Sequence, residues 1–504
     1  MTRVLHDIDR IEVTFDDPNL VANAGLLLVA TLTRRLGLEG LVNKMVKLIG
    51  RAGGALPGRK VLTLVHSMIA GGTHIDHADM LRAGSTGDVL GHRVMAPSTL
   101  GTFLRAFTFG HVRQLEAVIG QALERAWGFG VGPGGKPLVI DIDSTICEVD
   151  GKAKHGAGYG YTKKLGYHPL LATRADTGEI VQARMRKGSA NTQRGARRFI
   201  EELIARVRRA GAVGELTVRV DSGFWSNETI VVLNRLKVRY TMAVRTNTTG
   251  IATAIAGIAT SSWVEIDYTL AGRAEVAECD YTTGTGKHAV TRRLIVRRTK
   301  LSDTHQLKLW PDWRHHAFLT DLDGDAVSVD LFHRQHAVVE LAIKDLKQGA
   351  GMEHVPSGNF QANSAWLQCA VLAHNLIRWT AILGDIRIQN QLIVARTIRT
   401  RHLAVPGRLV NRSGRRHLRM PTNWPTGQQA QHSPPDSTNF VNSDQHPPEP
   451  GLAVKRAAHQ HRALTTRPAR TLLQRAPNPT GPSIGTRLKT QTPITTTPTT
   501  RSVD

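Results

Sequence analysis

The apolar residues of this chain change their spacing at a glycine-rich segment, residues 128–135, and this change limits the folds open to it. Before the segment, apolar residues recur at three- and four-residue steps, which predicts small helices. Directly after it, residues 137–143 read Pro-Leu-Val-Ile-Asp-Ile-Asp, an apolar run that predicts a buried strand. We therefore expect a helical N-terminal part followed by a part built around a sheet.

The helical part, residues 1–130, is expected to form a bundle. Its predicted helices cover residues 21–36, 61–68, 97–107 and 112–127. Basic residues on these helices would suit a DNA-binding domain: Arg34, Arg35, Arg93 and Arg105. A packing or dimerisation domain explains the same pattern equally well, so both interpretations stay open.

The sheet part has the order strand, strand, strand, helix, strand, helix, strand. The predicted strands are residues 137–143, 168–172, 180–185, 216–221 and 240–244, and the predicted helices are residues 191–209 and 227–236. Asp176-Thr177-Gly178 is a hairpin signal between the second and third strands. This order is typical of an RNase H-like α/β domain, a mixed sheet with flanking helices.

Four short strands then interrupt the alternation of strands and helices, at residues 263–270, 274–281, 293–298 and 316–319. We expect residues 131–247 to form the first part of the RNase H-like core and residues 248–315 an inserted β-rich subdomain. Residues 316–420 would complete the core and include an apolar helix at 362–382. Residues 421–504 are basic and rich in Pro and Thr, which predicts a disordered tail.

The run from His333 to Lys347 is predicted to be one amphipathic helix. Val339, Ile343 and Leu346 recur at helical spacing and would face the core. Glu340 and Lys347 lie two turns apart, so both side chains can face one cleft. A solvated face with a charge pair is the alternative interpretation.

Three carboxylates stand at positions suited to chemistry. Asp143 and Asp221 each close an apolar strand, where side chains at the carboxyl edge of a sheet are accessible, and Glu340 follows on the later helix. Three hard oxygen ligands can hold two divalent ions, which can activate a water or a 3′-hydroxyl for phosphodiester transfer. Asp141 lies on the same side of its strand as Asp143, and we expect it to support the site rather than to bind metal.

The charge of the chain favours nucleic acid as the partner. There are 65 Lys and Arg residues against 41 Asp and Glu, a net charge of +24, with a pI near 10.6. Three distant cysteines offer no zinc spacing and suit a reducing compartment. The apolar run Leu26 to Leu32 is too short to span a membrane, so we expect a cytoplasmic protein.

These motifs together resemble the DDE transposases of bacterial insertion sequences that carry an inserted β domain. Asp143-Ser144-Thr145 matches the first motif of that family, Asp221-Ser222-Gly223 matches the second, and Glu340 with Lys347 matches the last. His333 and His336 stand where the family has Tyr and Arg. Residues 159–169 are also similar to the segment that follows the first aspartate in one subgroup.

The resemblance implies a metal-dependent transposase that acts by phosphodiester hydrolysis and strand transfer in cut-and-paste transposition. Asp143, Asp221 and Glu340 would hold two Mg²⁺ or Mn²⁺ ions. The implied partners are double-stranded DNA, namely terminal inverted repeats and target DNA, and a second copy of the chain in a synaptic dimer at the bacterial nucleoid. The implied DNA contacts are Lys347, His336, His333, Arg334, Lys163 and Lys164.

Two other functions remain open at the level of sequence. Asp141-Ile142-Asp143-Ser144-Thr145 also fits the nucleophile motif of haloacid-dehalogenase-like phosphatases, with Asp141 as nucleophile and Asp143 as acid/base. Gly324-Asp325 and Asp330 would then supply the late acidic motif of such an enzyme. The other alternative is an inactive transposase remnant that binds DNA without cutting it.

Overall fold

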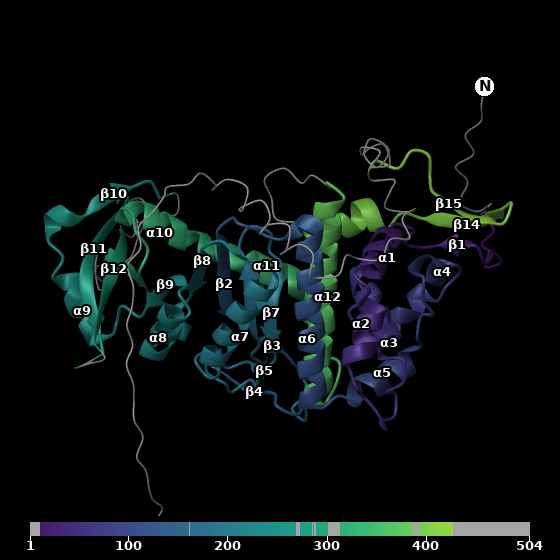
Figure 1. The fold of residues 1–504 in the computed structure, drawn as a ribbon, viewed down its shortest axis with the longest axis horizontal. Coiled ribbons are helices and arrows are strands. Elements are labelled where there is room, and N and C mark those ends of the chain that lie inside the picture. Colours follow the sequence, from purple (N-terminus) through teal and green to yellow (C-terminus); the bar gives the residue numbers. More distant parts are fainter. Residues whose placement is uncertain are drawn as a thin grey trace, which may run out of the picture. The chain divides into compact units, whose positions relative to one another are not determined.

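The computed structural model describes residues 11–160, 162–268, 273–284, 286, 289–300, 313–386 and 393–426. Most of the predicted tail, from residue 427 onward, lies outside the described residues. Within them the chain has a mixed α/β fold with one large mixed sheet and flanking helices, as the sequence predicts (Figure 1).

The N-terminal part is helical, as predicted. Its helices are α1 (Leu26–Arg35), α2 (Leu38–Met45), α3 (Pro57–Ile69), α4 (Thr86–Leu90), α5 (Pro97–Arg105) and α6 (Phe109–Ala126). The helix predicted from residue 21 begins only at Leu26, because Leu20 and Val21 form the short strand β1. Thr108 caps α6, and Pro97 occupies the first turn of α5, where its missing N–H costs nothing.

Nine strands of the described chain form the large sheet, in the order β10-β11-β12-β13-β9-β8-β2-β6-β7. Its first half contains β2 (Leu138–Ser144), β6 (Leu170–Arg174), β7 (Ile180–Arg184), β8 (Leu216–Val220) and β9 (Arg239–Val244), with helices α7 (Ala196–Arg209) and α8 (Asn227–Arg235) between them in sequence. Strand β2 is antiparallel to β6 and parallel to β8, and β8 is parallel to β9. The predicted order of strands and helices is confirmed.

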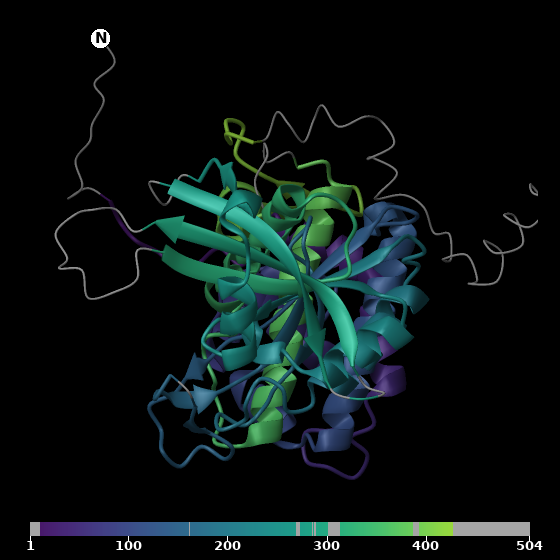
Figure 2. The same ribbon diagram turned by 90° about the vertical axis from the view of Figure 1, so that its left-hand side faces the viewer.

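The strands of the β-rich segment continue this sheet. They are β10 (Val264–Ile266), β11 (Arg273–Thr283), β12 (Val290–Lys300) and β13 (Trp313–Thr320), and β13 joins β9 in antiparallel pairing. Figure 2 shows them at the front as a twisted extension of the sheet. A helix that the sequence interpretation missed, α9 (Thr249–Ala256), precedes them and buries Ile251 and Ile255.

The single helix predicted from His333 to Lys347 is wrong, because two helices meet there. Helix α10 (Ala326–Arg334) ends in a 3₁₀ turn (Gln335–Ala337), after which α11 (Val338–Gly349) begins. Val339, Ile343 and Leu346 are buried as predicted. Helix α12 (Phe360–Leu383) follows, is buried along most of its length, and contacts α1, α3, α5, α6 and β7.

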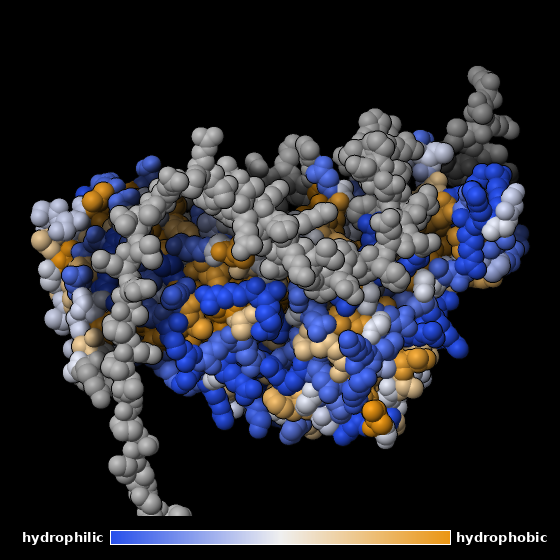
Figure 3. Space-filling model, in the orientation of Figure 1, coloured by the Kyte–Doolittle hydropathy of each residue, from blue (hydrophilic) through white to orange (hydrophobic). Residues whose placement is uncertain are grey.

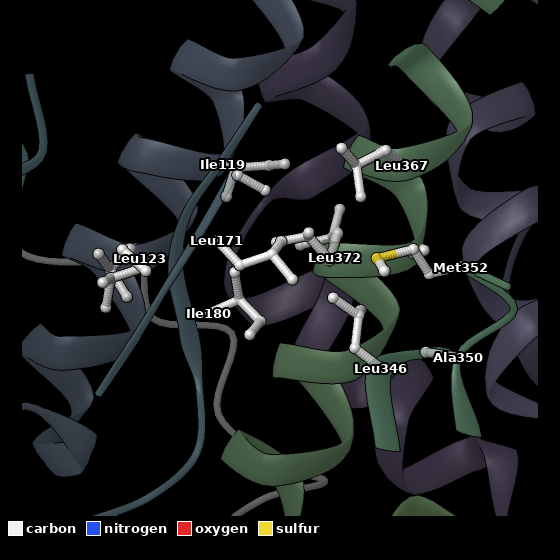
Figure 4. Close-up of a cluster of buried hydrophobic side chains, with 14 of the residues drawn as sticks. Ile119, Leu123, Leu171, Ile180, Leu346, Ala350, Met352, Leu367 and Leu372 are labelled. Carbon is white, nitrogen blue, oxygen red and sulfur yellow. The ribbon is translucent and has the colours of Figure 1, made fainter. Parts of the chain in front are cut away.

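The main core lies where α12 meets the sheet and the helical part. Figure 4 shows Ile119 of α6, Leu171 of β6, Ile180 of β7, Leu346 of α11 and Leu372 of α12 gathered in one cluster. Burying each such side chain contributes roughly 1.5–3 kcal/mol. This cluster therefore fixes α11 against β2 and β6, which both contact it.

Two smaller sheets complete the described structure. One contains β3 (Cys147–Glu148), β4 (Gly158–Tyr159) and β5 (Leu165–Tyr167); the other contains β1, β14 (Gly407–Arg412) and β15 (Arg415–Arg419). Helix α13 (Ala395–Ile398) precedes β14. The Arg399 side chain donates to the carbonyl of Ile69 at 2.8 Å, so the chain after residue 393 packs on the N-terminal helices.

The surface drawn in Figure 3 is largely hydrophilic, as a chain with this excess of basic residues requires. In the part of the chain that the structure describes, no helix combines the length and apolar character needed to cross a bilayer.

Candidate active site

Asp143 and Asp221 come together at one edge of the large sheet. Strands β2 and β8 run parallel with Ile142 opposite Val220, so the two aspartates that follow these residues stand side by side in the sequence register. The Asp143 carboxylate accepts a hydrogen bond from the Ser144 amide at 2.6 Å, and the Asp221 carboxylate accepts one from the Gly223 amide at 3.1 Å. These local bonds fix both side chains at the strand ends.

Glu340 is electrostatically part of the same group. The pKa of Asp143 is raised to about 6, first by burial and then by the charges of Asp221 and Glu340, while the Ser144 amide and His336 lower it. Burial also raises the pKa of Asp221. Glu340 lies in the first turn of α11 and its side chain is exposed. In the structure, the three predicted carboxylates are therefore close enough for the charges of Asp221 and Glu340 to raise the pKa of Asp143.

The donor set of this group suits a hard divalent cation. Carboxylate oxygens are the preferred protein ligands of Mg²⁺ and Mn²⁺, and a cation would relieve the repulsion that raises the pKa of Asp143. Among the described residues, no three His, Cys, Asp or Glu side chains are already arranged to hold a metal ion. Of the three predicted carboxylates, Asp143 and Asp221 are the two that the strand register sets side by side.

Asp141 is used differently from Asp143. Its buried carboxylate receives two hydrogen bonds from the Arg219 guanidinium, at 2.7 and 2.9 Å, and lies 2.8 Å from Nδ1 of His336. Arg219 also donates to the carbonyl of Phe332 in α10 at 2.7 Å. Asp141 thus connects β2, β8 and the segment before α11. Both of its carboxylate oxygens accept hydrogen bonds from Arg219, whereas the nucleophile of a phosphatase would need a free oxygen.

The late acidic residues of the phosphatase hypothesis are also engaged elsewhere. Asp325 caps α10 by accepting from the Ser328 amide at 2.9 Å. Asp330 is buried and pairs with Arg297 at 2.8 Å and Arg334 at 2.9 Å.

The other predicted site residues fall into two groups. Lys347 and His336 face the site region: Nζ of Lys347 donates to the carbonyl of Ile146 at 2.9 Å, and His336 lowers the pKa of both aspartates. Lys164 pairs with Glu148 at 2.6 Å, and Lys163 is exposed beside it.

His333 is half-buried and is held by β9 and β13. Its Nδ1 bonds to Oγ1 of Thr241 at 2.7 Å, and its ring stacks on Phe318 with centroids 4.1 Å apart. Burial, followed by the charges of His336, Arg219 and Arg297, lowers the pKa of His333 to about 3, so the ring is neutral near pH 7. The neutral ring of His333, which stands where the family has Tyr, therefore offers no positive charge to a phosphate.

Two residues at the site were not predicted from the sequence. Arg219 stands opposite Asp141 in the parallel pairing of β2 and β8. The sequence feature that could have indicated its role is a charged residue within the otherwise apolar strand Leu216–Val220. His168 is buried near Asp221, bonds through Nδ1 to the carbonyl of Ala190 at 2.7 Å, and interacts with the Asp221 charge. No sequence signal distinguished His168 from an ordinary core histidine.

A cleft of about 1140 Å³ opens beside Asp221, and Ser222 and His333 form part of its wall. The Arg298 guanidinium lies in this cleft between the rings of Trp263 and Trp313, at 4.0 and 4.4 Å from their centroids. The wall of this cleft formed by β12 and β13 therefore combines basic and aromatic side chains.

Asp143→Asn is expected to stabilise the metal-free protein. Because the folded pKa is raised above the unfolded one, the ionised carboxylate costs stability as pH rises through about 6. We expect a gain of about 3 kcal/mol in the free energy of unfolding above about pH 7, shrinking to below about 1 kcal/mol near pH 4. Urea unfolding in a chelating buffer measures it. Asn at the exposed Asp267 is the control, and an equal gain there would refute the explanation.

Comparison with known protein families gives a match over most of the chain. The family model described as transposase DDE domain group 1 matches residues 5–434. A search of curated proteins finds no match. Among solved structures, the cryo-EM structure of a piggyBac transposase synaptic complex with hairpin DNA is similar at 12% identity. The match covers 89% of this chain and 91% of that chain with a TM-score of 0.41, too low to carry a structural argument.

Proposed function

We propose that this chain, which belongs to the transposase DDE domain group 1 family, cuts DNA at the ends of an insertion sequence and joins the freed ends to target DNA. The catalytic residues in this proposal are Asp143, Asp221 and Glu340. The observation that supports them best is the raised pKa of Asp143, which burial and the charges of the other two carboxylates produce together. Carboxylates whose pKa is raised by burial and by one another's charge cluster at functional sites, and a bound cation would offset both costs.

We further propose that the core is RNase H-like. The strand order β7-β6-β2-β8-β9, with β8 and β9 parallel to β2 and the other two antiparallel to their neighbours, supports this assignment. Asp143 then lies near the end of β2, the central strand of this half, and Asp221 directly follows β8 beside it.

Transposases of this family generally use divalent metal ions, and we assign two Mg²⁺ or Mn²⁺ ions to Asp143, Asp221 and Glu340. When bound, such ions activate the attacking oxygen and stabilise the leaving oxygen in phosphodiester transfer. The chain itself holds the site rigid: Arg219 and Asp141 fasten β8 to β2, and the Arg219 bond to Phe332 fastens both to α10. These bonds would fix the position of α10 and, through it, the direction from which Glu340 approaches Asp143 and Asp221.

The proposed DNA contacts surround this group. Lys347 would exchange its hydrogen bond with the Ile146 carbonyl for one with a DNA phosphate. His336 is close enough to Asp143 and Asp221 to lower the pKa of both. Lys163 is exposed, and Arg334 and Lys164 would exchange their pairs with Asp330 and Glu148 for DNA phosphates. His333 is neutral and packed, so its contribution would be to support His336, 6.4 Å away ring to ring. A homodimer that holds two inverted repeats in the bacterial cytoplasm completes the proposal.

The test is cleavage of the DNA that flanks the gene. A plasmid that carries this DNA is incubated with the full chain and Mg²⁺ or Mn²⁺, and the 3′ ends are mapped. We expect breaks at both inverted repeats, with free 3′-hydroxyls and none in a chelating buffer. Binding without any break with either metal would favour the inactive remnant. Hydrolysis of p-nitrophenyl phosphate that survives Glu340→Gln would favour the phosphatase.

A further inference from the structure

Strands β14 and β15 form a ribbon whose geometry is well defined. They pair in antiparallel register from Arg408 opposite Arg419 to Arg412 opposite Arg415. Ser413 and Gly414 join them in a two-residue turn with φ of 50° and 73°, the left-handed turn that matches the twist of a two-stranded ribbon. Strand β1 pairs only with the base of β14, at Gly407 and Arg408, so the rest of the ribbon is two-stranded.

The two faces of this ribbon differ in chemistry. Leu409 and Leu418 stand opposite each other and pack on the cluster of Val21, Ala24 and Val89, which defines the inner face. Successive side chains of a strand point to opposite faces. The outer face therefore carries the exposed side chains Arg408, Arg412, Arg415, His417 and Arg419.

The arginines of the outer face oppose one another directly. Arg412 faces Arg415, and Arg408 faces Arg419. Like charges at directly opposed positions destabilise a sheet. Asp17 compensates Arg408 at 3.1 Å, but no carboxylate within the described ranges pairs with Arg412, Arg415 or Arg419. The arginine side chains of the outer face therefore repel one another, and a bound anion would reduce this repulsion.

We propose that the β14–β15 ribbon is a second DNA-binding element, which enters a groove of duplex DNA with its outer face. The major groove admits a two-stranded ribbon, and guanidinium groups bind phosphates and guanine edges. This inference rests on the proposed function, since it supplies duplex DNA as the partner. It concerns a sheet separate from the one that carries the catalytic carboxylates.

The surroundings of the ribbon are also basic. In Figure 1 the ribbon lies beside β1 at the right of the view, and the corresponding side of the surface in Figure 3 is largely hydrophilic. At its inner side, a cleft of about 580 Å³ is lined by Arg82, Arg93 and Arg416, with Asp88 3.4 Å from Arg416 as counter-charge. On the outer face, Asp17 is the carboxylate that the described structure pairs with the arginines, at Arg408.

The experiment measures binding of the full chain to a fluorophore-labelled linear duplex over a range of salt concentrations. The variant Arg412→Ala/Arg415→Ala/Arg419→Ala is expected to bind at least about tenfold more weakly and to lower the slope of log K against log[salt] by about 2–3. Arg415→Ala alone should lower the slope by about one, whereas Arg416→Ala, the next residue on the opposite face, should leave it nearly unchanged.

Two further measurements keep the outcome unambiguous. Alanine at the exposed cations Lys136, Arg209 and Lys237 removes the same charge elsewhere, and thermal unfolding checks that every variant is folded. Unchanged duplex binding by the folded ribbon variant overturns the proposal, as does an equal loss in the matched charge control. Preferential binding of single-stranded DNA or anionic vesicles through the ribbon also overturns it.

Failure of the ribbon and failure of the proposed function remain distinguishable. A ribbon variant that binds like the unmodified chain, together with metal-dependent cleavage by that chain, rejects the ribbon alone. A ribbon-dependent loss of duplex binding in a chain that cuts no DNA supports the ribbon and rejects the catalytic proposal.

Discussion

Asp221→Asn is expected to reduce metal-dependent cleavage of DNA to below about a thousandth of the unmodified rate while leaving DNA binding intact. Asp221 sits at the end of β8 beside Asp143, with an amide bond from Gly223 that fixes its orientation. Asparagine keeps the size and this bond but offers one neutral oxygen to a cation in place of a charged carboxylate. The loss should therefore appear in the chemical step and not in the affinity for DNA.

Matched variants make this result specific. Asp143→Asn and Glu340→Gln should show the same loss, because each removes one charge from the same group. Asp267→Asn, at an exposed aspartate, should cut DNA at the unmodified rate. The measurement is the rate of strand breakage with duplex affinity determined in parallel. Cleavage by Asp221→Asn at more than about a tenth of the unmodified rate would show that this carboxylate is no metal ligand.

The positions of Asp143 and Asp221 were predictable because they depend on local sequence and on a simple rule of sheets. Each follows a short run of apolar, largely β-branched residues bounded by turn residues. The hairpin of β6 and β7 and the helix α7 that connects β7 to β8 allow β8 to run parallel to β2. Both conditions can be read without knowing any distant contact. The strands and the helices around them were therefore placed to within a few residues.

The break between α10 and α11 was not predictable in the same way. Residues 333–347 keep helical spacing throughout, so the local signal favours one helix. The chain turns at Gln335–Ala337, where contacts from remote strands hold His333 just before the turn and His336 within it. Tertiary contacts of this kind override local propensity.

The basic ribbon was overlooked for a related reason. Its strands lack the strict apolar alternation that marks a half-buried strand, because arginine occupies most outward positions and only Leu409 and Leu418 pack inward. The Ser413-Gly414 turn was the one local signal, and it is common in loops as well. The many arginines therefore masked the alternation that marks a strand. That they share one face of the ribbon became apparent only from the pairing of β14 with β15.

Arg219→Met is expected to lower the free energy of unfolding by about 3–5 kcal/mol, because it leaves the Asp141 carboxylate buried without its bidentate partner. Removing both charges in Asp141→Leu/Arg219→Met should recover most of this loss, since no buried charge remains uncompensated. Arg198→Met, at an exposed pair with Glu202, should cost less than about 1 kcal/mol. Urea unfolding measures all three. A cost for Arg219→Met as small as that of Arg198→Met would mean that the pair does not hold β2 and β8 in place for the site.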